Sequence, residues 1–134
     1  MNFKEKINRL HKLEAEIHRS TLLLKQLETA AAKMTPVLHY APSGPGGESR
    51  SLEKLMVRIA DMRKDVNRLT AEYFELNREL VDLINKLPDE NYSDVLTYRC
   101  IQGLSWPKVA NELHFSDGYT RRLFKKAMDA IEKL

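Results

Sequence analysis

The sequence has a single cysteine, five glycines, five prolines and no long apolar run. Cys100 has no second cysteine to pair with, which excludes an internal disulfide framework and is consistent with a reducing compartment. No purely apolar run exceeds three residues, whereas a helix that spans a bilayer needs about 20. The first residues, MNFKEKINRL, are charged rather than apolar, so we expect no secretory signal peptide. These absences predict a cytoplasmic protein without membrane contact.

The sequence also lacks the residue combinations that catalysis or cofactor binding would need. His11 and His18 share one face of a predicted helix, but no third metal ligand accompanies them. The segment SGPGG at residues 43–47 lacks the Lys-Ser/Thr pair that completes a phosphate-binding loop. No Ser–His–Asp or Cys–His arrangement can be defended. We therefore predict no enzyme activity, no metal site and no cofactor.

Charged and apolar residues are both plentiful. Charged residues make up 31% of the chain and hydrophobic residues 43%, a balance that is typical of a helix-rich globular protein. The net charge is +3 and the isoelectric point is about 9.0. This balance permits an acidic partner such as nucleic acid but does not require one.

Apolar spacing predicts an all-α fold that begins with a long helical hairpin. Phe3, Leu10, Ile17 and Leu24 recur every seven residues, which predicts a helix over about residues 3–34. Residues 35–50 contain three prolines and three glycines, so we interpret them as a linker. Such a linker is long enough to fold the first helix back, antiparallel, onto a second.

A stricter apolar seam predicts that second helix over about residues 51–87. Its members alternate steps of three and four residues, the spacing of a coiled coil. The seam comprises Leu52, Leu55, Ile59, Met62, Val66, Leu69, Tyr73, Leu76, Leu80, Leu83 and Leu87. Ser51 can cap the helix, and Pro88 ends it. We assign residues 1–87 to the hairpin and expect its surplus apolar surface to contact a second copy or the C-terminal part.

Residues 88–134 predict a separate unit of short helices. Asp89 or Asn91 starts the first of them, Ser105 caps a helix over WPKVANEL, and Ser116 caps the last after the corner HFS. A short capped helix, a tight corner and a longer basic helix are the ingredients of a helix-turn-helix. The last helix carries a basic face that comprises Arg121, Arg122, Lys125 and Lys126.

The charge of this unit leaves a different function open. Residues 88–134 contain seven Lys and Arg against seven Asp and Glu, a net charge of zero. A basic helix face in a neutral unit suits DNA binding, but it also suits a helical hairpin that docks another protein.

The segment LPDENYSDVLTYRCIQGLSWPKVANELHFSDGYTRRLFKKAMDAIEKL resembles region 4 of bacterial sigma factors. Within that group the chain looks most like the late-transcription regulators of phages and mobile elements (the RinA/ArpU kind). The resemblance implies a helix-turn-helix domain at residues 88–134 that binds double-stranded DNA in a bacterial host cell. Together with the pattern above, it points to a DNA-binding set: Ser105, Lys108, Ser116, Asp117, Gly118, Tyr119, Arg121, Arg122, Lys125 and Lys126. Gly118 stands where sigma factors use a side chain to read bases.

We therefore expect a sequence-specific transcription regulator, an activator of phage or mobile-element late genes. The hairpin would form a homodimer or dock the protein to RNA polymerase. Two alternatives stay open. One is a helical structural or assembly protein whose C-terminal hairpin docks another protein, and the other is a DNA-packaging adaptor like a small terminase subunit.

Overall fold

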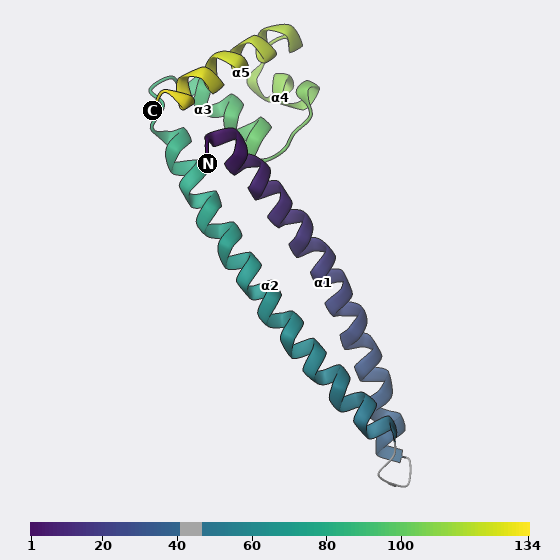
Figure 1. Ribbon diagram of the computed structural model, residues 1–134. Coiled ribbons are helices and arrows are strands. Elements are labelled where there is room, and N and C mark those ends of the chain that lie inside the picture. Colours follow the sequence, from purple (N-terminus) through teal and green to yellow (C-terminus); the bar gives the residue numbers. More distant parts are fainter. Residues whose placement is uncertain (41–46) are drawn as a thin grey trace. The chain divides into compact units, whose positions relative to one another are not determined.

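The computed structural model describes residues 1–40 and 47–134, and the regular elements within them are all helices (Figure 1). They are α1 (Phe3–Tyr40), α2 (Gly47–Asn85), α3 (Glu90–Leu96), the π-helical turn η1 (Thr97–Ile101), α4 (Trp106–Leu113) and α5 (Asp117–Glu132). The predicted all-α fold with a long N-terminal helical hairpin is confirmed. Within the described ranges, none of the helices combines the length and apolar character needed to cross a membrane.

Both long helices extend into the predicted linker. Residues 35–40 belong to α1 and residues 47–50 to α2, whereas residues 41–46 of that linker lie outside the described residues. The helix α1 continues through Pro36 to Tyr40, although a proline inside a helix removes one backbone hydrogen bond and crowds the preceding turn. Ser51 therefore lies inside α2 and not at the capping position that its sequence context suggested.

The C-terminal end of α2 lies two residues before the predicted end. The helix stops at Asn85, and the amides of Lys86 and Leu87 bond to carbonyls three residues earlier, at 3.2 and 3.1 Å. These shorter-range bonds tighten the last turn and satisfy carbonyls that have no donor within an α-helix. Pro88, which has no amide hydrogen, follows this turn and disfavours a further turn of helix.

Within the described residues, 12–40 of α1 and 47–72 of α2 belong to one compact unit. The two helices run antiparallel and side by side in it (Figure 1). Leu13 and Ala31 of α1 are buried, as are Ile59 and Leu69 of α2. An ion pair joins Glu28 to Arg63, with 3.5 Å between Oε2 and Nη2.

The predicted seam of α2 is shielded from solvent along its whole length. All ten residues that we predicted as the seam between Leu52 and Leu83 are buried or half-buried. Outside the seam, Met56 and Val57 remain 47% and 62% exposed. The seam spacing thus marks the face of α2 that packs against protein, while a second apolar area of the same helix faces solvent.

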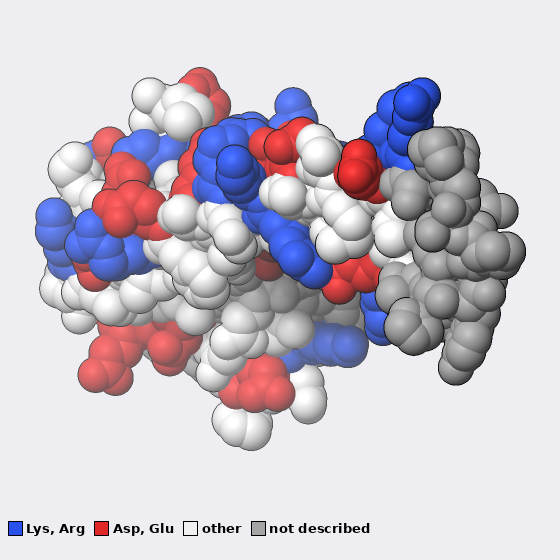
Figure 2. Space-filling view, turned by 90° about the horizontal axis from the view of Figure 1, so that it is seen from below, with Lys and Arg blue, Asp and Glu red and all other residues white. Residues whose placement is uncertain are grey.

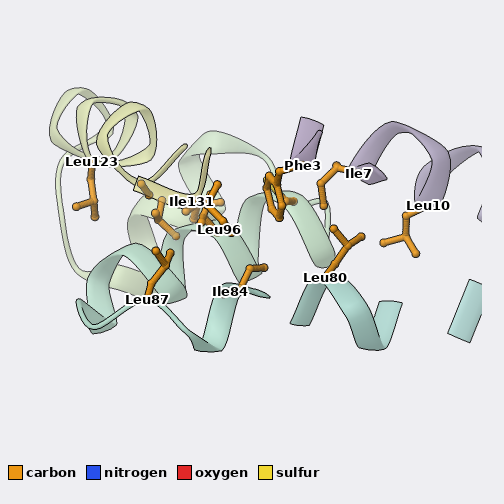
Figure 3. Close-up of a cluster of buried hydrophobic side chains, with 13 residues drawn as sticks. Phe3, Ile7, Leu10, Leu80, Ile84, Leu87, Leu96, Leu123 and Ile131 are labelled. Carbon is orange, nitrogen blue, oxygen red and sulfur yellow. The ribbon is translucent and has the colours of Figure 1, made fainter. Parts of the chain in front are cut away.

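The second compact unit comprises residues 1–11 and 73–134. Figure 3 shows its core, where Phe3 and Ile7 of α1 lie beside Leu80 and Ile84 of α2. The same cluster includes Leu87, Leu96, Leu123 and Ile131. The contacts therefore divide the chain differently from the predicted boundary between residues 87 and 88. Three short helices offer too little apolar area to close a core, so the first turns of α1 and the last turns of α2 complete it.

Replacing Leu10 with alanine should strongly destabilise this unit. Leu10 is fully buried, and a buried Leu→Ala change costs about 2–5 kcal/mol because it removes contacts and leaves a cavity. Leu22→Ala on the same helix is the matched control, because Leu22 is 52% exposed and should change stability by less than about 0.5 kcal/mol. Urea unfolding followed by circular dichroism measures both values. Equal losses for the two variants would contradict the described core.

Candidate nucleic-acid interface

The two helices α4 and α5 are joined by a corner of three residues, His114 to Ser116. His114 ends α4 in the left-handed backbone conformation, with φ 60°, and its amide returns to the carbonyls of Ala110 and Asn111. The amide of Phe115 bonds to the carbonyl of Ala110 at 3.0 Å. These bonds satisfy the last carbonyls of α4 while the chain changes direction. The corner is therefore a hydrogen-bonded turn of defined geometry.

Serine and aspartate begin the short helices, but they do not all cap in the same way. The hydroxyl of Ser116 accepts a hydrogen bond from the amide of Tyr119 at 3.2 Å, and Asp89 accepts from the amide of Asn91 at 2.9 Å. Ser105 occupies the capping position of α4 with extended backbone, yet its side chain makes no capping hydrogen bond. Pro107 at the start of α4 has no amide to satisfy, which reduces the need for such a cap.

One side of α5 is buried and the other faces solvent. Thr120, Leu123, Ala127 and Ile131 are buried, as their spacing of three or four residues requires for one helix face. The single polar member, Thr120, donates its hydroxyl hydrogen to the carbonyl of Ser116 at 2.7 Å. The buried face of α5 packs on α3 and α4. The direction in which α5 presents its charged residues follows from this packing.

All ten residues that we predicted for DNA binding are exposed, and they lie on the first turn of α4, at the corner and on α5. Arg121, Arg122, Lys125 and Lys126 occupy the solvent side of α5, and Lys108 is exposed on α4. Within the described part of the chain, none of these five cations forms an ion pair with an acidic side chain. Their charges are therefore available to an anionic partner.

Gly118 leaves space beside the first turn of α5, and Arg122 occupies the edge of that space. A Cβ added at Gly118 would lie 3.6 Å from Nη1 of Arg122, an ordinary contact distance. The guanidinium of Arg122 thus extends back toward the N-terminal turn of the helix. The free amides of that turn carry the positive end of the helix dipole, so two sources of positive potential coincide there. The side chain of Asp117 lies in the same turn and partly offsets them.

The basic face of α5 is a local arrangement of cations within a unit that has no excess of positive charge. Figure 2 shows one face of the molecule, on which Lys and Arg are interspersed with Asp and Glu. Residues 88–134 carry no net charge. An electrostatic attraction for nucleic acid would therefore depend on the arrangement of the cations and not on their total.

Trp106 and Arg99 form a cluster next to α5 that the sequence did not reveal. The Arg99 guanidinium carbon lies 4.4 Å from the centre of the Trp106 ring, and that of Arg121 lies 5.4 Å from it. Phe124 meets the same ring edge-on, with 5.0 Å between ring centres. Trp106 is half-buried, and both guanidinium groups face its ring. Arg99 and Trp106 are seven residues apart and lie on different elements, so no helical period relates them.

The π-helical turn η1 places Arg99 and Cys100 in different environments. The Gln102 amide donates to the Thr97 carbonyl at 2.9 Å. This bond links residues five apart, whereas the bonds of an α-helix link residues four apart. Arg99 is half-buried, whereas Cys100 is only 7% exposed. Burial raises the pKa of the Cys100 thiol to about 11, although the nearby charge of Arg99 opposes this shift. The thiol is therefore neutral at physiological pH.

His11 is another residue whose role the sequence did not indicate. Its Nε2 atom lies 2.8 Å from the carbonyl oxygen of Cys100, at the end of η1. A carbonyl can only accept, so this ring nitrogen carries the hydrogen. His11 thus joins α1 to the C-terminal helices of the same compact unit. Among residues 1–40 and 47–134, no three His, Cys, Asp or Glu side chains gather as metal ligands would.

These features define an all-helical protein with an exposed basic helix that follows a tight corner. Residues 37–132 match the family described as "Protein of unknown function (DUF1492)", and the chain belongs to this family. The same comparisons found no matching curated protein and no matching solved structure.

The two serine caps should respond differently to alanine substitution. Ser116→Ala removes a capping hydrogen bond and should lower the free energy of unfolding by about 1 kcal/mol. Ser105→Ala is the matched control. It should lower the free energy of unfolding much less than Ser116→Ala does, because the Ser105 side chain makes no capping bond. Thermal and urea unfolding of the two variants measure the difference. A larger loss for Ser105→Ala would show that the capping roles are reversed.

Cys100 should react slowly with a thiol reagent as long as the protein is folded. With the pKa at about 11 instead of 9.0, the folded protein contains about 100-fold less Cys100 thiolate at pH 8 than the unfolded chain does. Reaction with Ellman's reagent at pH 8, with and without urea, should show at least this difference in rate. Because the folded state retains the proton, the free energy of unfolding should also decrease as the pH rises from about 9 to about 11. Equal reaction rates in the two states would contradict the burial.

Proposed function

We propose that this protein is a sequence-specific DNA-binding transcription regulator in which α4 and α5 form a helix-turn-helix. The observation that carries the proposal is the exposed basic face of α5, which lies opposite the buried Leu123, Ala127 and Ile131. A recognition helix must be covered on one side and free on the other, and it must begin with amides and cations directed at the DNA. The resemblance to sigma region 4 supports this assignment.

The exposed residues divide into two groups by the DNA atoms that they would contact. Asp117, Gly118 and Tyr119 lie in the first turn of α5, the part of a recognition helix that usually meets base edges. Lys125 and Lys126 lie farther along α5, and Lys108 lies on α4, where long cationic side chains suit backbone phosphates. Because Gly118 presents no side chain, we propose that this turn approaches the groove closely and that neighbouring side chains read the sequence.

The hairpin would supply the second copy that a small DNA-binding module needs. One such module buries only about 600–1,000 Å² on DNA, and joining two raises the overall affinity. Leu22, Leu23, Met56 and Val57 are large apolar side chains of the hairpin unit that remain between 40% and 62% exposed. These side chains support a protein contact, which we propose to be a homodimer or a contact with RNA polymerase. In a dimer, the DNA half-sites would be spaced by one helical turn or a multiple of it.

The same exposed apolar side chains favour one alternative, a structural or assembly protein that uses the hairpin to bind other chains. The two functions differ in what α5 does. A regulator requires the basic face of α5 for DNA retention, whereas an assembly protein does not. The regulator that we propose acts in the bacterial cytoplasm, as an activator of phage or mobile-element genes.

Reversing two charges on α5 tests the proposal. Arg121→Glu combined with Arg122→Glu should abolish retention of duplex DNA, because it replaces two exposed cations with anions. DNA for the assay comes from selection of a random duplex library on the wild-type protein. Retention is measured by fluorescence anisotropy over a series of salt concentrations. For about four to six phosphate contacts per module, the wild-type log–log slope should be about −4 to −5 for each bound module.

The matched control is Lys64→Glu combined with Arg68→Glu on α2, which makes the same change in net charge at two exposed positions. This control should retain most of the affinity, and both variants should keep the wild-type helicity and oligomeric state. Unchanged DNA binding in the α5 variant would refute the proposed function. Equal losses in the two variants would show that net charge alone attracts the DNA.

A further inference from the structure

Trp106 is the point at which three elements of the C-terminal unit meet. The tryptophan lies at the start of α4, and its ring contacts Arg99 from η1 and both Arg121 and Phe124 from α5. Phe124 fixes one edge of the ring through a perpendicular contact, at an interplanar angle of 80°. The ring is therefore held in place independently of the arginines.

The two arginines that share this ring differ in how firmly they are held. Arg99 is half-buried, lies closer to the ring, at 4.4 Å, and donates from Nη1 to the carbonyl of Leu104 at 2.8 Å. Arg121 is exposed, and its one partner within the described part of the chain is the ring, at 5.4 Å. Arg99 is thus a fixed cation of the fold, whereas Arg121 can still bind a ligand.

Two guanidinium groups on one aromatic ring attract the ring and repel each other. The ring face is electron-rich, so it attracts both cations, and a bound anion would lower the repulsion between them. A phosphate that meets Arg121 supplies this anion and gains from the nearby charge of Arg99. An exposed arginine normally loses side-chain freedom when it binds, and prior contact with a rigid ring lowers this entropic cost.

We propose that Trp106 is a positioning residue that holds Arg121 ready for a backbone phosphate of DNA. This proposal rests on the proposed function and extends it, because it assigns Arg121 to the phosphodiester backbone and gives Trp106 a role beyond the core. Arg122, the neighbouring residue on α5, extends toward Gly118 instead and is not part of this cluster.

A double-mutant cycle separates this role from simple packing. The variants are Trp106→Leu, Trp106→Phe, Arg121→Ala and Arg122→Ala, together with Trp106→Leu combined with each arginine change. Affinity is measured by anisotropy on a selected 30-base-pair duplex and on a scrambled duplex of the same composition. Circular dichroism checks that each variant is folded, and NMR records the Arg121 side-chain Nε–H signal in the free protein.

The proposal predicts four results. Trp106→Leu should weaken binding about three- to tenfold on both duplexes, because the loss of one cation–π contact affects a sequence-independent phosphate contact. This effect should disappear in the Arg121→Ala background and persist in the Arg122→Ala background. Trp106→Phe, which keeps a ring, should restore much of the affinity. The Arg121 Nε–H signal should lose its ring-current shift in Trp106→Leu.

Other outcomes would overturn the proposal in distinguishable ways. An undiminished effect of Trp106→Leu in the Arg121→Ala background would assign Trp106 a structural role only. Tight wild-type binding that Trp106→Leu does not change would refute the positioning role and leave the proposed function intact. If the wild-type protein binds neither duplex, the proposed function fails and the positioning role fails with it.

Discussion

The arrangement of the C-terminal unit depends on the burial of one face of α5. Leu123, Ala127 and Ile131 are spaced by four residues, and each is at most 6% exposed. Placing this stripe against α3 and α4 leaves the helix no freedom to rotate about its axis, because a rotation would expose apolar area and bury charge. The outward direction of Arg121, Arg122, Lys125 and Lys126 is therefore a consequence of core packing. A neutral unit can present a basic surface in this way without any excess of positive residues.

The core that holds α5 includes the first turns of α1 and the last turns of α2. Phe3 and Ile7 come from the start of α1, and Leu80 and Ile84 come from the end of α2. The hydroxyl of Ser93 donates to the carbonyl of Ile84 at 3.1 Å, which ties α3 to the last turn of α2 across the break at Pro88. His11 makes a similar connection to η1 through the Cys100 carbonyl. Each polar link satisfies a carbonyl near a helix end, where the helix itself offers no donor.

Sequence periodicity predicted the elements of this fold better than their limits and contacts. The three- and four-residue steps from Leu52 to Leu83 marked the protected face of α2. The linker was predicted too long, because glycine and proline are averaged over a window, whereas a helix ends at individual residues. Ser116 and Ser105 each precede a predicted helix, yet only Ser116 makes the capping bond. Pro107 removes one amide from the first turn of α4, so the two serines do not face the same set of donors.

In the candidate site, too, features of a single helix could be predicted, whereas contacts between different elements could not. The basic face of α5 could be predicted because a single helix carries it and its period is known. The contacts of Trp106 could not, because Arg99, Trp106 and Arg121 come from three elements whose arrangement depends on η1 and on the corner at His114. Helical periodicity thus identified the exposed cations of α5, but only the tertiary packing shows that they differ from one another. Arg121 contacts an aromatic ring and Arg122 lies over a glycine, so two adjacent arginines with equal charge have different surroundings.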